Sequence, residues 1–339
     1  MPHREAMRLG LCKYLITIII FILLFEILFQ ILFIFNLSFI KQPILYYNGY
    51  CDQKYWLLNE KKIKFNENIL PHKILSFQKK SVFIPNKFEN LNEKVLKKFS
   101  KNQLSFFGSS YINHQEVVNI IAEYEDLTYT NYALESYGLD QIYLSYKLTS
   151  HLNHNKTIVF GFLLEDLDRS IFNYREYQKA QFIMKNNNFE LKNIPIDQNL
   201  EISAKKDFYL YRFLSNFYSL IINNFDPRKS ECQIENKKEL FKFFFDDIIK
   251  EADKLNQKII VITFNLKEDL NNEPTWRYEY MKNYFAKNNI LHIDSLQIMK
   301  NKSVEYNEKI DDYFGRDAHN NQKSFRYIFD EFEKIYNAM

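Results

Sequence analysis

The chain has 339 residues, of which 46% are hydrophobic and 26% are charged. These proportions are those of a globular protein and exclude a disordered or fibrous chain. The formal net charge is only +3 and the basic residues are spread evenly, so no nucleic acid is expected as a partner.

The N-terminal part of the chain carries a long apolar segment, from Tyr14 to Ile40. Since about 20 apolar residues suffice to cross a bilayer as a helix, residues 14–40 are predicted to form a transmembrane helix. Glu26 lies in this segment at a cost of roughly 2.5–3.5 kcal/mol, which the many Leu, Ile and Phe residues outweigh at roughly −0.3 to −0.6 kcal/mol each. Its carboxyl group could be tolerated by protonation or by reaching toward the interface, or it could make a helix–helix contact in the membrane.

The charges that flank this segment predict its orientation. Arg4, Arg8 and Lys13 precede it, whereas Lys41 is the nearest charge after it. Because cytoplasmic flanks carry the excess of basic residues, residues 1–13 are expected in the cytoplasm and the rest of the chain outside. A cleaved signal peptide is the alternative, but the apolar run is longer than an ordinary signal and no small-x-small site follows it. We therefore predict a single-pass membrane protein with an extracytoplasmic C-terminal domain.

The chain has three cysteines. Cys12 falls on the predicted cytoplasmic side, whereas Cys51 and Cys232 fall outside, where a disulfide is permitted. The sequence leaves open whether these two are bonded or are unrelated thiols. No Cys/His cluster suggests a zinc site, and no metal or other cofactor is expected.

Regular alternation of strands and helices begins at about residue 101. Before it, residues 41–100 show weak periodicity and several turn signals, and are interpreted as a juxtamembrane linker that packs partly on the main domain. Apolar runs typical of buried parallel strands occur at 103–108, 126–134, 157–164, 258–265 and 290–294. Helical spacing of apolar residues occurs at 115–124, 139–152, 207–224, 237–257, 276–287 and 323–336.

This alternation predicts an α/β domain at residues 101–339. We expect a flavodoxin-like three-layer sandwich, in which helices cover both faces of a mostly parallel five-stranded sheet. Residues 167–205 interrupt the alternation and are interpreted as an excursion over the top of the sheet. In such sheets ligands bind at the carboxyl ends of the strands, which is where a functional site is expected.

Two polar motifs fall at this edge of the predicted sheet. Gly108, Ser109 and Ser110 follow the first strand where a helix begins, so a serine hydroxyl there would lie beside a positive helix N-terminus. His319 follows Asp317 by two residues in the loop before the last helix, and a carboxylate so close could orient the imidazole as the base of a serine nucleophile. Each motif has another interpretation, since a Gly-Ser-Ser turn is often only an N-cap and an Asp-x-His pair is usually a solvated surface.

Taken in this order, the motifs resemble those of the SGNH (GDSL-type) hydrolases, and the resemblance covers roughly residues 100–338. That family carries its nucleophilic serine in a Gly-Asp-Ser turn after the first strand. The resemblance therefore implies that Ser110 is the nucleophile and that Ser109 replaces the aspartate. The family's last block supplies an Asp and a His, which implies that Asp317 and His319 complete a catalytic triad.

The two middle blocks of the family match less well. The second block has an asparagine and, five residues later, a glycine whose amide helps to form the oxyanion hole. Asn131 and Ser136 occupy these places, Gly138 matches a glycine that often follows, and a serine amide can serve if its backbone conformation allows. The third block normally ends in Asn-Asp with the Asn as an oxyanion donor, whereas this chain has Glu165 and Asp166. An ionised Glu165 would repel a developing oxyanion, and it can donate a hydrogen bond only when protonated.

The resemblance implies a serine esterase or an O-acyltransferase. Ser110 would attack an ester carbonyl, His319 would carry the proton and Asp317 would orient the imidazole, while the amides of Ser110 and Ser136 would hold the oxyanion. For a domain tethered outside the membrane, the implied partner is an acyl ester of an envelope polysaccharide or lipid, by analogy of fold alone. Two alternatives stay open: a catalytically inactive relative that serves as a binding or scaffold module, and an unrelated α/β protein.

Overall fold

The computed structural model of the chain describes residues 2–35, 37, 40–58, 68–88, 103–124, 127–154, 156–186, 188–197, 207–225, 232–271, 273–316 and 319–339. Its contacts divide the chain into two compact units. The first unit comprises Met1–Ile63, Phe172–Tyr177 and Asn199–Cys232, and the second comprises Lys64–Ile171, Gln178–Gln198 and Gln233–Met339. In this partition residues 199–232 group with the N-terminal segments.

The second unit has a parallel five-stranded sheet at its centre. The strands are β3 (Leu104–Gly108), β4 (Tyr129–Asn131), β5 (Thr157–Leu163), β10 (Lys258–Phe264) and β11 (Leu291–Asp294). They lie in the order β11-β10-β5-β3-β4, and each neighbouring pair is parallel. This is the predicted flavodoxin-like α/β architecture. The chain runs from β3 out to β4 and returns to β5 on the other side of β3, so the strand order reverses between β3 and β5.

The two strands that flank this reversal are buried along their whole length. Parallel strands with helices on both faces meet no water, which explains why both read as continuous apolar runs. Phe107 of β3 lies between the rings of Tyr132 and Phe160, at centroid distances of 4.8 and 5.7 Å. The carboxyl ends of β3 and β5 therefore rest on a packed core and flank the usual ligand position of such sheets.

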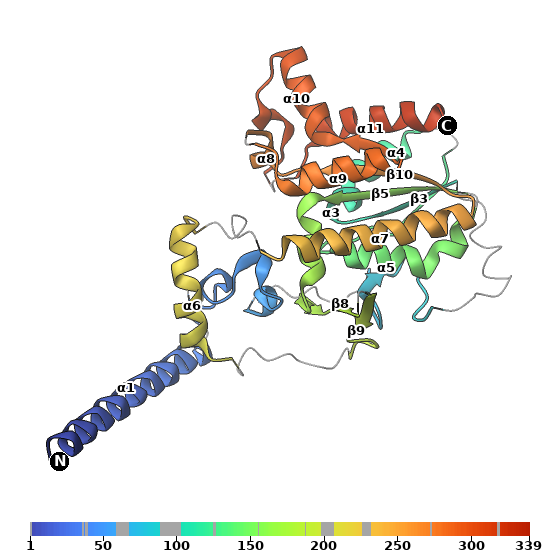
Figure 1. The fold of residues 1–339 in the computed structure, drawn as a ribbon. Helices are drawn as coiled ribbons and strands as arrows, with labels where there is room; N and C mark the ends of the chain where they lie inside the picture. Colours follow the sequence, from blue (N-terminus) through green and yellow to red (C-terminus); the bar gives the residue numbers. More distant parts are fainter. Residues whose placement is uncertain are drawn as a thin grey trace. The chain divides into compact units, whose positions relative to one another are not determined.

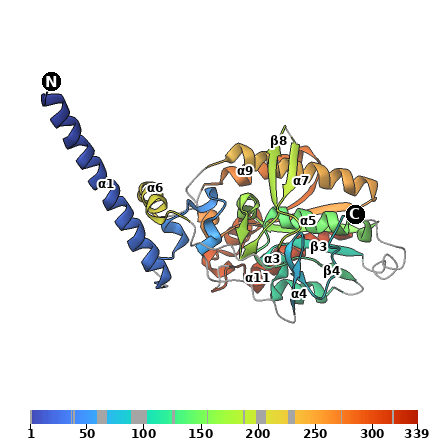
Figure 2. The same cartoon turned by 90° about the horizontal axis from the view of Figure 1, so that it is seen from below.

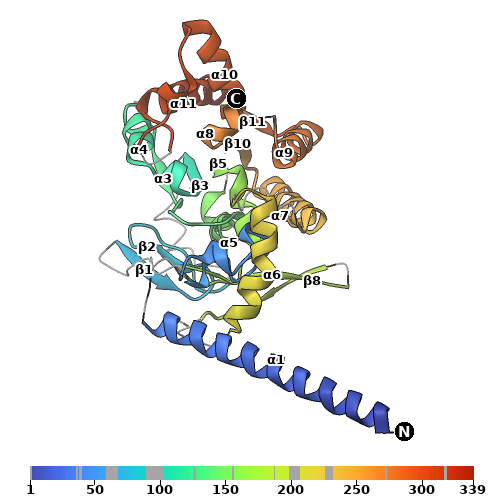
Figure 3. The ribbon, with the colours of Figure 1, turned by 90° about the vertical axis from the view of Figure 1, so that its left-hand side faces the viewer.

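Helices cover both faces of the sheet (Figures 1 and 3). On one face α4 (Gln115–Ala122) contacts α11 (Gln322–Asn337). On the other face α5 (Leu139–Thr149) contacts α7 (Ile234–Lys254), and α7 packs on α9 (Trp276–Lys287) through Phe241 and Phe285 at 5.7 Å. The short helices of this unit are α3 (Ser110–Asn113), α8 (Lys267–Asn271), η4 (Ser150–Asn153), η5 (Leu164–Asp166), η6 (Asp168–Ile171) and η9 (Ile310–Tyr313).

The second unit also contains elements that the sequence did not predict. An antiparallel hairpin of β1 (Ile69–His72) and β2 (Ser76–Lys79) lies within the expected linker. Another, of β8 (Gln181–Lys185) and β9 (Asn188–Lys192), lies within the expected excursion. It packs on α7, where the rings of Phe182 and Phe244 lie 5.0 Å apart. Figure 2 shows β8 beside α7. The helix α10 (Ser295–Tyr306) follows β11 directly, with the Asp294 side chain as its cap.

The first unit is built around two helices, α1 (Pro2–Ile34) and α6 (Tyr209–Ile222). Residues Cys12–Ile34 of α1 are long and apolar enough to cross a membrane, and the helix ends before the predicted limit of residue 40. Cys51 and Cys232 are joined by a disulfide, the first of the two alternatives that the sequence left open. The remaining elements are η1 (Pro43–Leu45), η2 (Gly49–Cys51), η3 (Tyr55–Leu58) and the two-residue strand β6 (Tyr174–Arg175), which pairs with β7 (Tyr177–Gln178).

Candidate active site

Two facing glycines shape the turn after β3. Gly108 ends β3 and lies opposite Gly161 of β5. A Cβ atom on Gly108 would lie 2.2 Å from the Gly161 carbonyl oxygen, and one on Gly161 would lie 2.2 Å from Cγ1 of Ile112. Ile112 belongs to α3 and is completely buried. The missing side chains therefore make room for Ile112, which seats α3 on the sheet and fixes the position of Ser110, its first residue.

Ser109 and Ser110 have different environments. Ser109 is the N-cap residue of α3, yet its side chain makes no capping hydrogen bond. It is completely buried, and its amide donates to the carbonyl oxygen of Gly161 at 3.2 Å. Ser110 is only half-buried. The interpretation of this turn as a simple N-cap therefore does not describe α3, and Ser110 carries the hydroxyl that a ligand can reach.

His319 lies next to Ser110, although 209 positions separate them in the sequence. The His319 Nε2 atom is 2.9 Å from Ser110 Oγ, which is the distance expected between a nucleophile and its base. The loop that carries the imidazole is tied by backbone hydrogen bonds. The amide of Gly315 donates to His319 O at 2.8 Å, and that of Asn321 donates to Tyr313 O at 2.9 Å. Asp317, the predicted third member of the triad, lies outside the described residues.

Two aromatic rings border the imidazole of His319. The rings of Tyr111 and His114 lie 4.7 and 5.5 Å from it, between centroids. Tyr111 is buried, so its ring is held in place and the imidazole packs against it. The sequence did not single out Tyr111, although this residue directly follows Ser110. Only its place next to Ser110 could have indicated a role in the site. In a chain with 24 Tyr and 32 Phe, the presence of an aromatic residue at one position carries little information.

Asn131 and Ser136 lie at and after the end of β4. Asn131 Nδ2 donates to Ile112 O at 3.1 Å, and its Oδ1 accepts from Ala133 N at 3.0 Å. Its side chain therefore joins this loop to α3. Ser136 has a φ of 66°, in the left-handed region that glycine enters most easily. Ser136 therefore adopts a backbone conformation in which glycine is the usual residue, although it has a side chain.

Gly138 lies in a crowded position. A Cβ atom there would be 2.6 Å from Asp140 Oδ1 and 2.9 Å from Arg169 Cβ. Its amide donates to Gln141 Oε1 at 3.2 Å, and Gln141 Nε2 donates to Leu75 O at 2.7 Å, between β1 and β2. Gly138 therefore permits close packing, and Gln141 fastens the β1–β2 hairpin to the start of α5.

Asp166 has its carboxylate engaged within the protein. It follows β5 and is completely buried. Its Oδ2 accepts a hydrogen bond from Leu163 N at 2.9 Å, and its Oδ1 pairs with the guanidinium of Arg169. Asp166 therefore stabilises the turn after β5, so that its neighbour Glu165 has a fixed position at the end of that strand.

Glu165 is a buried carboxyl group at the carboxyl end of β5. Burial, reinforced by the negative charge of Asp269, raises the pKa of Glu165 to about 8. The group is therefore mostly protonated at neutral pH and can donate a hydrogen bond. Among the described residues, no partner bonds its Oε2 atom. In its protonated form Glu165 carries no charge, so it would not repel an oxyanion as an ionised carboxylate would.

The second unit also contains two groups of buried ion pairs that the sequence did not indicate. Asp168 accepts from Arg277 Nε and Nη2 at 2.7 and 2.9 Å and pairs with Lys237 Nζ at 2.6 Å. Asp140 pairs with Lys179 at 3.0 Å, with both side chains fully buried. Charged residues on helices usually face water, so their spacing gave no signal of burial. The pairs of Asp168 join η6, α7 and α9 beside the turn that carries Glu165, whereas the Asp140–Lys179 pair ties α5 to the residue after β7.

Within the described ranges, no three His, Cys, Asp or Glu side chains are grouped so as to hold a metal ion. The arrangement offers a serine, an imidazole and a neutral carboxyl group, which are the groups of acyl-transfer chemistry.

Comparisons with known proteins give a limited result. No family model matches the sequence, and no curated protein matches it significantly. Five chains of solved structures match it. One is a member of the lipolytic protein G-D-S-L family from Veillonella parvula DSM 2008, at 11% identity and a TM-score of 0.42, with 70% of this chain and 98% of that chain covered.

Proposed function

We propose that the chain is a membrane-anchored serine esterase or O-acyltransferase of the SGNH type, with Ser110 as nucleophile and His319 as general base. The observation that carries this proposal is the 2.9 Å approach of His319 Nε2 to Ser110 Oγ. It occurs at the carboxyl end of β3, beside the reversal of strand order where ligands of such sheets bind. An imidazole that bonds an accessible serine hydroxyl at this point is the arrangement that nucleophilic catalysis requires.

The proposed reaction passes one proton through His319. Nε2 accepts the proton of the Ser110 hydroxyl while Oγ attacks the ester carbonyl carbon. The tetrahedral intermediate then expels the alcohol, which takes the proton from His319, and the acyl group stays on Ser110. Water or a second alcohol next gives its proton to His319 and attacks the acyl group, which releases a carboxylic acid or a new ester and restores the serine. Asp317 is proposed to orient the imidazole.

Three donors are proposed for the oxyanion. Two are the backbone amides of Ser110 and Ser136, which need no particular side chain. The third is the protonated carboxyl of Glu165, at the place where the SGNH family has an asparagine. Its pKa of about 8 supports this role, because a neutral carboxylic acid in an apolar site donates a hydrogen bond without opposing the negative charge.

We further propose that α1 is a single-pass anchor with its N-terminus in the cytoplasm. The apolar segment Cys12–Ile34 and the basic residues before it support this orientation. The disulfide between Cys51 and Cys232 supports an extracytoplasmic location for the residues after α1, because disulfides persist in oxidising compartments. An ester of an envelope polysaccharide or lipid is the substrate that this location suggests.

A fluorophosphonate probe tests the proposal, since it reacts with a serine that a base activates. We expect the full-length protein in detergent to be labelled, and the label to be lost in Ser110→Ala. Ser109→Ala is the matched control and should keep the label. The replacement of the family's asparagine by Glu165 favours the alternative, an inactive SGNH-fold binding or scaffold protein. A folded wild-type protein that takes no label would support that alternative and overturn the proposal.

A further inference from the structure

Helix α6 carries an apolar face that is exposed. The exposed large side chains on the helix and at its two ends are Phe208, Tyr211, Leu214, Phe217, Tyr218, Ile221, Ile222 and Phe225. Tyr211, Leu214 and Tyr218 expose 71%, 62% and 73% of their surface. The members within the helix recur three and four residues apart and so lie on one face. A contiguous apolar face of this kind marks an interaction site, because water solvates it poorly.

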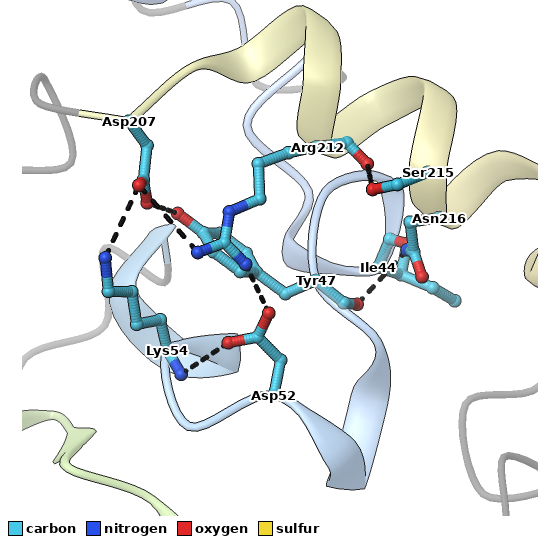
Figure 4. A network of polar contacts seen from close by, with 8 residues as sticks. All are labelled: Ile44, Tyr47, Asp52, Lys54, Asp207, Arg212, Ser215 and Asn216. Atoms are coloured by element: carbon cyan, nitrogen blue, oxygen red, sulfur yellow. Dashed lines mark hydrogen bonds and ion pairs between the residues drawn. The ribbon is translucent and has the colours of Figure 1, made fainter.

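The opposite face of α6 packs inside the first unit. Tyr209 stacks on Phe33 of α1 with ring centroids 3.8 Å apart. Asn216 is 4% exposed, and its Nδ2 donates to Ile44 O at 2.7 Å and to Tyr47 O at 3.2 Å (Figure 4). The rotation of α6 about its axis is therefore fixed, and the apolar face is the one that is left outward.

The charge on α6 is also turned away from that face. Arg212 is the only charged residue between Tyr209 and Ile222. Its guanidinium pairs with Asp52 and Asp207 and lies 4.6 Å from the ring centre of Tyr47 (Figure 4). The exposed face therefore carries no ionised side chain that would resist transfer from water into lipid.

Helix α1 holds the N-terminal end of α6. The carboxylate of Glu26 accepts hydrogen bonds from the amides of Tyr209 and Leu210, at 3.1 and 2.8 Å. Gln30 Nε2 donates to Asp207 O at 2.8 Å. A carboxylate is a favourable cap for a helix N-terminus, whose first amides have no partner within the helix. Glu26 thus makes a contact between two helices of the first unit.

These contacts set the depth of α6 relative to the candidate span. Gln30 and Glu26 precede Ile34, the last residue of that span, by about 6 and about 12 Å of helix rise. The N-terminal end of α6 therefore lies near the boundary between the hydrocarbon and the headgroups of a bilayer that α1 crosses. Figure 3 shows α6 running crosswise to α1 and not alongside it. A helix placed in this way extends along the membrane surface.

We propose that α6 is an interfacial helix whose apolar face is immersed in the lipid of the leaflet where α1 ends. Lipid, and not a protein partner, is the occupant because α6 packs on α1, whose own large apolar side chains are exposed, and because α6 starts at the depth of the interface. Tyr211 and Tyr218 fit such a depth, where tyrosine is enriched. The first unit is then held to the membrane by one spanning helix and one lying helix. This inference rests on the proposed membrane span of α1, but it does not depend on the chemistry of Ser110.

The test uses the full-length protein in liposomes of phosphatidylcholine and phosphatidylglycerol. Cys12→Ser removes the free thiol, and Leu214→Cys or Tyr218→Cys then carries an environment-sensitive NBD label on the apolar face. Lys287→Cys, at an exposed position of α9, is the matched control. Mass analysis without reductant checks that the native disulfide is intact. Quenching is compared between lipids with a doxyl group on the acyl chain and iodide in the water.

We expect the labels at positions 214 and 218 to be quenched by the doxyl lipid and protected from iodide. The label at position 287 should show the reverse. Labels on α6 that iodide quenches and doxyl lipid does not would place the face in water and overturn the proposal. Labels on α6 that are protected from both quenchers would show that protein covers the face, which would overturn it equally.

Discussion

His319 Nε2 and Ser110 Oγ lie 2.9 Å apart, although independent parts of the second unit hold them. The serine is positioned by the packing of Ile112 against two glycines, and the histidine by backbone hydrogen bonds within its own loop. Neither side chain is needed to hold the other in place. Substitution at either position therefore tests chemistry more than folding.

Removal of the proposed base should abolish turnover. His319→Gln keeps a polar side chain but cannot carry the proton, so kcat/KM for a short-chain aryl ester should fall on the order of 10⁴-fold or more, as in Ser110→Ala. The double variant should lose no more than either single variant, because the two residues act as a unit. Losses that multiply in the double variant would contradict this pairing.

The neutral carboxyl of Glu165 predicts an alkaline limit to activity. Its pKa is raised to about 8, so the donating, protonated form is lost as the pH rises through 8, and kcat should decline there. Glu165→Gln donates at every pH and should remove this decline. Glu165→Ala should instead lower kcat at all pH values, by about 10²-fold for the loss of one oxyanion donor. A wild-type profile identical to that of Glu165→Gln would refute the role of the carboxyl.

The same group gives a prediction for stability. Since its pKa rises on folding from 4.5 to about 8, the folded state binds more protons between these two values. The free energy of unfolding contributed by Glu165 should therefore fall as the pH rises through this window and stay level above it. Denaturant unfolding in detergent should show a weaker pH dependence in Glu165→Gln than in the wild type. An unchanged slope would mean that Glu165 is not buried as a neutral acid.

The glycine pair predicts a specific packing conflict. Gly161→Ala would place a methyl group 2.2 Å from Cγ1 of Ile112, so we expect a loss of about 1–3 kcal/mol in the free energy of unfolding and a displaced Ser110. Ile112→Ala removes the clashing atoms, so Gly161→Ala should cost much less in that background. Gly108→Ala is the control, because its clash is with the backbone oxygen of Gly161 and cannot be relieved in this way. Equal costs of Gly161→Ala in both backgrounds would rule out this account.

Ser136 tests whether an amide or a hydroxyl serves the oxyanion. Its φ of 66° is accessible to glycine without strain, so Ser136→Gly should leave both the fold and the amide in place. We expect kcat within a few-fold of the wild type, measured on the same aryl ester. A loss of about 10²-fold, the size of one oxyanion donor, would assign the donor to the hydroxyl.

The sheet could be predicted from the spacing of apolar residues along the sequence. The edge of the sheet at which the serine and the histidine lie follows from the order of the strands and helices. The strands β3 and β5 are buried throughout and therefore read as apolar runs, and the order of strands and helices places residues 110 and 319 at the same edge. The β1–β2 hairpin could not be predicted, because Pro71 interrupts its pattern and Gln141, distant in the sequence, helps to hold it.

Burial explains the other failures of prediction. That Glu165 replaces an asparagine is visible in the sequence, but its raised pKa depends on the residues packed around it. Asp168 and Arg277 read as surface charges until the fold brings them together at 2.7 Å. The spacing in α6 predicted a helix correctly, but helical spacing shows only which residues share a face. Whether water, protein or lipid covers that face depends on what the opposite face packs against.

Glu26 provides a test of how α6 is attached to α1. Glu26→Leu removes the acceptor of the Tyr209 and Leu210 amides, and the loss of such a cap costs about 0.5–2 kcal/mol. In lipid nanodiscs, amide hydrogen exchange of residues 207–225 should therefore accelerate about 2- to 30-fold, while that of α11 should not change. Glu26→Gln keeps one acceptor oxygen and should have a smaller effect. Exchange that is equally fast in all three proteins would mean that α6 is held without Glu26, by its aromatic contacts and the Arg212 network alone.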